Sequence, residues 1–140
     1  FQSDEEDMYD DIIHEIAHAV EDHNIELIYG DEKLMVEFLG KRKRLYNLLK
    51  SKGYDVKLEE FLRVTYDYDF DMFLFQELGY PLLRNLTMGL FPGPYSVTSL
   101  NEYYATGFET YYMRKGNKIS KMCPELMKKI DYLDELANEY

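Results

Sequence analysis

Apolar residues recur at helical intervals along much of this chain. From about Met8 to Glu26 they fall three or four positions apart, and a second run of the same kind covers Glu32 to Lys52. A glycine-containing break at Gly30 separates the two runs, and Gly53 closes the second one. The pattern therefore predicts two amphipathic helices in the first third of the chain.

The pattern beyond residue 56 is less regular but remains mainly helical. Residues 57–91 predict two or three short helices, broken near Gly79-Tyr80-Pro81 and near Met88-Gly89. The proline-rich stretch FPGPYS that follows predicts a loop or an extended strand. The pattern predicts two further helices, over residues 98–113 and 123–140. We therefore expect a mainly α fold, with α+β as an alternative, formed by residues 1–140 as a single domain.

Composition and charge limit the classes of partner. Hydrophobic residues make up 46% of the 140 residues and charged residues 31%, as is usual for one globular domain. A net charge of −11 repels phosphate backbones, so we expect no nucleic-acid partner. The basic run Lys41-Arg42-Lys43-Arg44 is interpreted as a solvated helix face.

The remaining global features concern membranes, cysteine and the chain ends. No apolar run approaches the length of a membrane span, so we expect no membrane partner. The single cysteine, Cys123, excludes an internal disulfide framework and leaves the redox compartment open. Because the chain opens on Phe1, we interpret it as a fragment or as one domain of a longer protein.

The first predicted helix contains the stretch His14-Glu15-Ile16-Ala17-His18. Residues four apart lie on one face of a helix, so two imidazoles can point at the same tetrahedral Zn²⁺. A glutamate beside the first histidine can then take a proton from the attacking water. Since this pattern often arises by chance, a third ligand is needed before it defines a site.

His23 is the nearest candidate for that third ligand. It lies five residues after His18, which turns it away from the ligand face. The metzincin pattern would also require a glycine and a histidine where this chain has Glu21 and Asn24. We therefore interpret His23 as a surface residue.

Asp67, Asp69 and Asp71 have the spacing of calcium-loop ligands. The glycine that such a loop requires is replaced by Met72, and its closing glutamate by Leu78. We interpret the segment as an acidic turn.

Two glutamates in the predicted helix 98–113 remain as candidates. Glu102 and Glu109 are seven residues apart and share a face in an apolar, aromatic context, where a carboxylate needs a neutralising cation. From spacing alone, either could be the ligand and the other an outer-shell residue.

Three elements together resemble a known family. They are HEIAHAVED, a tyrosine at Tyr95 in PYS, and Glu102 seven residues later, followed by two tyrosines and an alanine. In this order and spacing they resemble the catalytic domain of anthrax toxin lethal factor and its relatives, which include the clostridial Pro-Pro endopeptidases. The resemblance extends through most of the chain.

The resemblance implies a zincin-like zinc metalloendopeptidase that acts on a peptide or protein substrate. By this resemblance, His14, His18 and Glu102 bind one Zn²⁺, Glu15 is the general base, and Tyr95 donates a hydrogen bond to the oxyanion. It also implies a secreted or host-targeted location. The alternative is a non-cleaving structural or interaction module of a larger toxin or phage virion protein.

The chain departs from this family in two places. Residues 57–91 form an insertion relative to lethal factor, which we interpret as a helical elaboration packed on the core. Its aromatic residues also suggest a second interpretation, a lid or substrate wall. Thr106 stands where lethal factor has an acidic residue, four positions after the third ligand.

Overall fold

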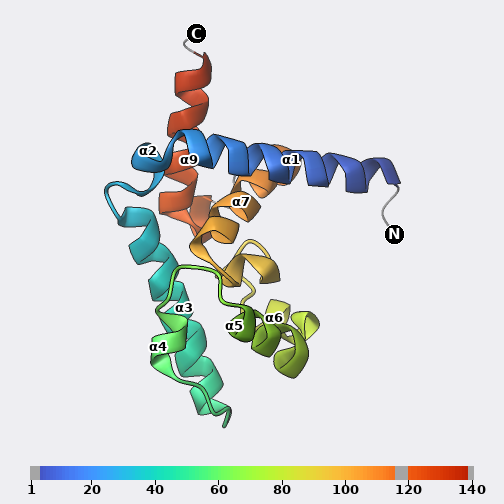
Figure 1. The fold of residues 1–140 in the computed structure, drawn as a ribbon, viewed down its shortest axis with the longest axis vertical. Helices are drawn as coiled ribbons and strands as arrows, with labels where there is room; N and C mark the ends of the chain where they lie inside the picture. Colours follow the sequence, from blue (N-terminus) through green and yellow to red (C-terminus); the bar gives the residue numbers. More distant parts are fainter. Residues whose placement is uncertain (1–3, 116–119, 139–140) are drawn as a thin grey trace.

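The computed structural model describes residues 4–115 and 120–138, and these residues are mainly helical, as predicted. No β-strand occurs among them. Figure 1 shows α1 lying across the upper part of the molecule, α3 running along its length, and α4, α5 and α6 gathered at the lower end. The elements are α1 Asp4–His23, α2 Ile25–Tyr29, α3 Lys33–Ser51, α4 Leu58–Phe61, α5 Tyr68–Met72, the π-helix η1 Phe73–Leu78, α6 Tyr80–Leu86, the 3₁₀ turn η2 Pro94–Val97, α7 Leu100–Thr110, the π-helix η3 Tyr111–Lys115 and α9 Pro124–Asn138.

The first predicted helix differs from the observed one at both ends. α1 begins four residues earlier than predicted, and it ends at His23 rather than near Glu26. Asn24, whose side-chain amide donates to the Val20 carbonyl at 2.8 Å, separates it from the short helix α2. α1 packs mainly against α7, and its N-terminal half extends beyond the other helices (Figure 1).

The long helix α3 organises the core, and its bounds match the prediction closely. Phe38 packs against Phe91 and Tyr103, with ring centroids 6.2 and 5.3 Å apart. On the same helix, Glu37 accepts hydrogen bonds from the Tyr103 hydroxyl at 2.6 Å and the Glu125 backbone N–H at 2.7 Å. This carboxylate thereby joins α3 to α7 and to the start of α9.

The prediction that Lys41 to Arg44 form a solvated face is wrong for the first two residues. Lys41 is buried and donates to the Met122 carbonyl at 2.6 Å. Arg42 is only 1% exposed and donates to the Val97 and Thr98 carbonyls at 2.6 and 2.9 Å. Both side chains lie on the inner face of α3, whereas Lys43 and Arg44 are exposed.

Residues 57–91 form short helices, with breaks at the predicted places. Gly79 ends η1 with φ at 82°, a conformation that glycine adopts without strain. Asp67 caps α5 by accepting from the Phe70 N–H at 2.9 Å. The segment predicted as an acidic turn is instead the helix α5, in which Asp71 is buried and accepts from the Tyr66 and Tyr80 hydroxyls at 2.5 and 2.9 Å.

The segment between residues 91 and 100 leads directly into α7. The stretch predicted as a loop or strand contains a 3₁₀ turn, Pro94–Val97. Ser99 then caps α7, because its hydroxyl accepts from the Glu102 N–H at 3.2 Å. In the described part of the chain, no helix is long and apolar enough to cross a membrane.

Candidate metal centre

His14, His18 and Glu102 lie together where α1 crosses α7. One ring nitrogen of each histidine and one oxygen of Glu102 all lie within 4.8 Å of one another. Nε2 of His14 is 3.1 Å from Glu102 Oε2, and Nε2 of His18 is 3.3 Å from Glu102 Oε1. The four-residue spacing on α1 places both rings over the first turn of α7, which Ser99 holds in place.

This set of atoms fits a divalent metal such as Zn²⁺. Two imidazole nitrogens and one carboxylate oxygen are common zinc ligands, and atoms about 2.1 Å from one tetrahedral ion lie about 3.4 Å apart. The two nitrogen–oxygen separations, 3.1 and 3.3 Å, are close to this value; they run to different oxygens of the carboxylate, and the set of one atom from each residue lies within 4.8 Å. Oε2 of Glu102 is buried and accepts no hydrogen bond from any described residue, so a cation would satisfy it.

The geometry distinguishes Glu102 from Glu109, which spacing alone left open. Glu102 faces Nε2 of both histidines, whereas Glu109 lies 3.7 Å from Nδ1 of His14, on the other side of that ring. Glu102 is thus the carboxylate that lies between the two histidines, and Glu109 lies on the far side of the His14 ring.

A second outer carboxylate, Glu21, was missed by the sequence analysis. It lies on α1 three residues after His18, with Oε1 at 3.2 Å from His18 Nδ1. Its other oxygen accepts a hydrogen bond from the Tyr29 hydroxyl. The three-residue spacing is a usable signal, since residues three apart on a helix are neighbours.

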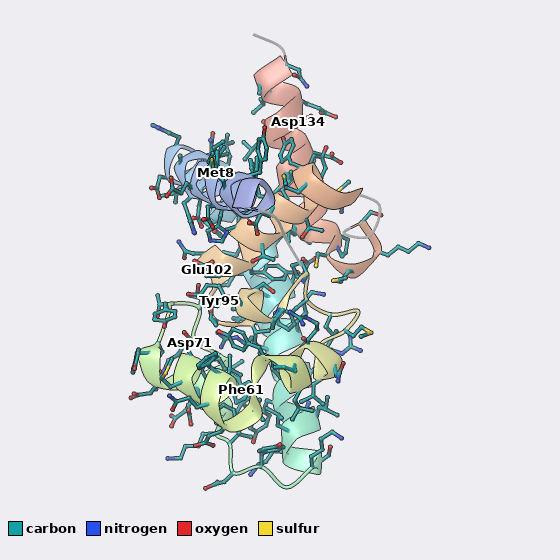
Figure 2. All side chains as sticks on the ribbon, turned by 90° about the vertical axis from the view of Figure 1, so that its right-hand side faces the viewer. Met8, Phe61, Asp71, Tyr95, Glu102 and Asp134 are labelled. Atoms are coloured by element: carbon teal, nitrogen blue, oxygen red, sulfur yellow. The ribbon has the colours of Figure 1, made fainter. Side chains whose placement is uncertain are left out.

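Tyr95 lines a cavity of about 410 Å³ beside the cluster. Figure 2 shows it next to Glu102, on the side toward Asp71. Its side chain is 41% exposed. Desolvation, followed by the charges of Glu102 and Asp71, raises the pKa of Tyr95, so the phenol keeps its proton and remains a donor at pH 7. The lining residues are His18, Thr65, Tyr66, Tyr95, Ser99, Asn101 and Glu102.

The structure does not bring Glu15 into this cavity. Glu15 is exposed on α1, on the turn between the two histidines, and is not among the lining residues. By contrast, Thr65 and Tyr66 show that the segment 57–91 does form part of the cavity wall. Phe61 and Phe70 of the same segment are buried in the core, so the segment both packs on the core and borders the site.

The other residues considered as ligands lie away from the cluster. His23 is exposed at the end of α1, as expected for a surface histidine. Asp67 and Asp71 are used in capping and in tyrosine hydrogen bonds within the segment 57–91. Among the residues that the structure describes, His14, His18 and Glu102 are the group arranged to hold a metal ion.

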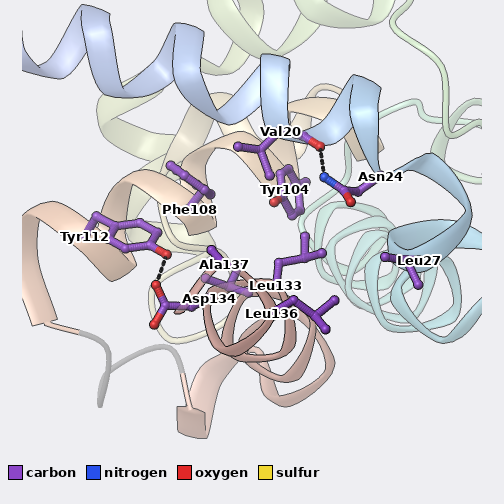
Figure 3. A pocket seen from close by; sticks show the side chains of 11 residues that line it. Val20, Asn24, Leu27, Tyr104, Phe108, Tyr112, Leu133, Asp134, Leu136 and Ala137 are labelled. Carbon is purple, nitrogen blue, oxygen red and sulfur yellow. Dashed lines mark hydrogen bonds between the residues drawn. The ribbon is translucent and has the colours of Figure 1, made fainter. Parts of the chain in front are cut away.

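A second cavity lies between α1, α7 and α9, separate from the cluster (Figure 3). It measures about 470 Å³ and is mainly apolar. The Tyr112 hydroxyl donates to Asp134 at 2.6 Å near its edge, and Val20 and Leu133 form part of its walls.

Comparisons of the chain with protein-family models, with curated proteins and with solved structures found no match.

Proposed function

We propose that the chain is a zinc-dependent endopeptidase of the zincin type, in which His14, His18 and Glu102 bind one Zn²⁺. The proposal depends chiefly on the convergence of these three side chains, with a buried Glu102 oxygen that no described residue hydrogen-bonds. The resemblance to the lethal factor family, in which the same residue types occupy these positions, supports the same conclusion.

The residues around the cluster have the chemistry that peptide hydrolysis requires. When bound, Zn²⁺ would supply a Lewis acid and lower the pKa of a bound water to about 7. The Glu15 carboxylate would accept a proton from the attacking water and pass it to the leaving amine. The neutral phenol of Tyr95 would donate a hydrogen bond to the negative charge that develops on the carbonyl oxygen.

The cavity lined by Tyr66 and Tyr95 would receive the peptide next to the metal. Its two tyrosine side chains are 48% and 41% exposed, so their rings are available to contact a substrate. In this proposal the segment 57–91 forms a wall of the substrate cleft.

The direct test uses zinc-reconstituted protein and a peptide library, with chelator-treated protein as the control. Cleavage should depend on zinc, and Glu15→Gln should lower kcat/KM by about 10²- to 10⁴-fold while retaining the metal. Tyr95→Phe should lower kcat by about 10²- to 10³-fold, the usual effect of losing an oxyanion donor, again with zinc retained. Glu26→Gln, an exposed carboxylate on α2, is the matched control and should have no effect.

One observation favours the second candidate function, a module that binds metal without cleaving peptides. Glu15 does not line the cavity that Tyr95 and Glu102 share. A wild-type protein that binds one zinc ion but cleaves no member of the library would favour this candidate. Full activity of Glu15→Gln would contradict the proposed mechanism.

A further inference from the structure

Glu21 is a carboxylate buried beside the candidate metal centre. Its side chain is 2% exposed, and no lysine or arginine of the described residues forms an ion pair with it. Its partners are Nδ1 of His18 at 3.2 Å and the hydroxyl of Tyr29. Because a buried carboxylate is costly unless it is hydrogen-bonded or paired, Glu21 depends on these two contacts, one of which is with a histidine of the cluster.

The contact with Glu21 determines how His18 faces the cluster. A carboxylate accepts a hydrogen bond, so this contact at 3.2 Å favours the tautomer of His18 that carries its proton on Nδ1. In a neutral imidazole, Nε2 is then left with a lone pair, directed toward Glu102 at 3.3 Å. This is the tautomer that a metal ligand needs.

Two tyrosines lie near the Glu21 carboxylate, and one of them, Tyr29, donates a hydrogen bond to it. Burial and the hydrogen bond to Glu21 raise the pKa of Tyr29, so its hydroxyl remains a donor to Glu21. The Tyr104 hydroxyl is buried nearby without a hydrogen-bond partner among the described residues, and its pKa is raised by burial and then by the charge of Glu21. In such a low-dielectric place, a charge acts strongly on its neighbours.

The two histidines of the cluster differ in the carboxylate that lies next to their Nδ1 atoms. Glu109 lies farther from His14, at 3.7 Å, and its side chain is 25% exposed. Glu21 is closer to His18 and almost completely buried. Of the two outer carboxylates, Glu21 is therefore expected to have the larger effect on metal affinity.

We propose that Glu21, held by Tyr29, is a positioning residue that sets the metal affinity of the centre formed by His14, His18 and Glu102. It fixes the ring orientation and tautomer of His18, and its negative charge strengthens Nε2 as a ligand. This inference rests on the proposed zinc site and adds a residue to it that neither the motif nor the resemblance assigned.

The experiment measures zinc affinity of the metal-free protein by competition with a chromophoric chelator. Glu21→Gln keeps the shape and removes the charge, and should weaken zinc binding about 10- to 100-fold, as loss of an outer-shell partner does. Tyr29→Phe leaves the carboxylate in place and should weaken binding about fivefold, the effect of one hydrogen bond. Asp22→Asn removes the same charge from the next, exposed position of α1 and should leave the affinity unchanged.

A second readout separates positioning from general stability. The absorption spectrum of the Co²⁺-substituted protein reports ligand geometry, so Glu21→Gln should change it while Asp22→Asn should not. If Glu21→Gln does not fold, the Tyr29→Phe affinity and spectrum provide the same test.

The outcomes distinguish this inference from the proposed function. Wild-type protein that binds no zinc overturns the proposed site itself. Wild-type protein that binds zinc, together with Glu21→Gln and Tyr29→Phe variants that bind it within twofold of wild type and give an unchanged Co²⁺ spectrum, overturns only the role of Glu21.

Discussion

Arg42 and Glu102 are both charged side chains placed among packed helices, but their surroundings differ. The guanidinium of Arg42 donates to the carbonyls of Val97, Thr98 and Phe61 at 2.6, 2.9 and 3.2 Å. It also lies over the ring of Phe70, 4.4 Å from its centroid. Burial lowers the pKa of Arg42 to about 9, which leaves the group charged at pH 7.

Glu102 has no comparable set of partners. In the described part of the chain, its ion-pair contacts are with His14 and His18 alone, and its Oε2 accepts no hydrogen bond. The cation at Arg42 is thus satisfied by carbonyls of the chain itself, whereas Glu102 has only the two histidines beside it and one oxygen without a hydrogen bond from the described residues. The difference separates a buried charge that holds the fold together from a charge whose proposed role is to bind a metal ion.

The largest expected effect is at Arg42. Arg42→Met removes the cation and leaves several buried carbonyls without donors, so we expect the free energy of unfolding to fall by about 3–5 kcal/mol, with or without zinc. Urea denaturation measures this. Arg44→Met on the exposed face of the same helix is the control and should cost less than about 0.5 kcal/mol; equal stability of the two variants would contradict the comparison.

A smaller effect, and one that depends on metal, is expected at Glu102. If the proposed site binds zinc, then zinc at 100 times its Kd would stabilise the native wild-type protein by about 2.7 kcal/mol, and Glu102→Gln should lose most of this gain. Without zinc, the variant should be no less stable than wild type, because the substitution removes the charge of a carboxylate whose buried Oε2 accepts no hydrogen bond from the described residues. Thermal unfolding with and without zinc tests both statements, and a zinc-independent loss of stability would count against an open metal site.

The smallest effects are expected at two helix caps, one beside each charge. Asp67→Ala removes the cap of α5, which carries Phe70 over Arg42, and Ser99→Ala removes the cap of α7, which carries Glu102. Each should cost about 1 kcal/mol of stability. Only Ser99→Ala should also weaken zinc binding, as measured by chelator competition. An equal change in zinc affinity in both variants would contradict the proposed difference between Arg42 and Glu102.

Much of the fold was predictable because it follows from local patterns. The apolar period predicted α3 and α9 within a few residues, and the glycine at Gly79 predicted the break after η1. The early start of α1 was not predicted, since the acidic residues before Met8 carry no apolar signal. The 3₁₀ turn in the proline-rich stretch was also missed, because prolines exclude a helix interior but do not select a turn type.

The buried charges were harder to predict, for different reasons. Arg42 stands four residues after Phe38 and three before Leu45, which places it on the apolar face, but the run of basic residues was interpreted by its charge alone. The grouping of His14, His18 and Glu102 was predicted from helix spacing and from the resemblance. The spacing of Glu21 from His18 was visible in the sequence, but its burial and its hydrogen bond from Tyr29 of α2 were not.

The buried Cys123 allows the local opening of the protein to be measured chemically. It is the chain's only cysteine, it has no exposed surface, and burial raises its pKa to about 11. Because the thiolate is the reactive form, a thiol reagent can modify it only when the packing between α3, α7 and α9 opens. At reagent concentrations where modification is faster than reclosing, the rate of this reaction would equal the opening rate, and no further cysteine would have to be introduced.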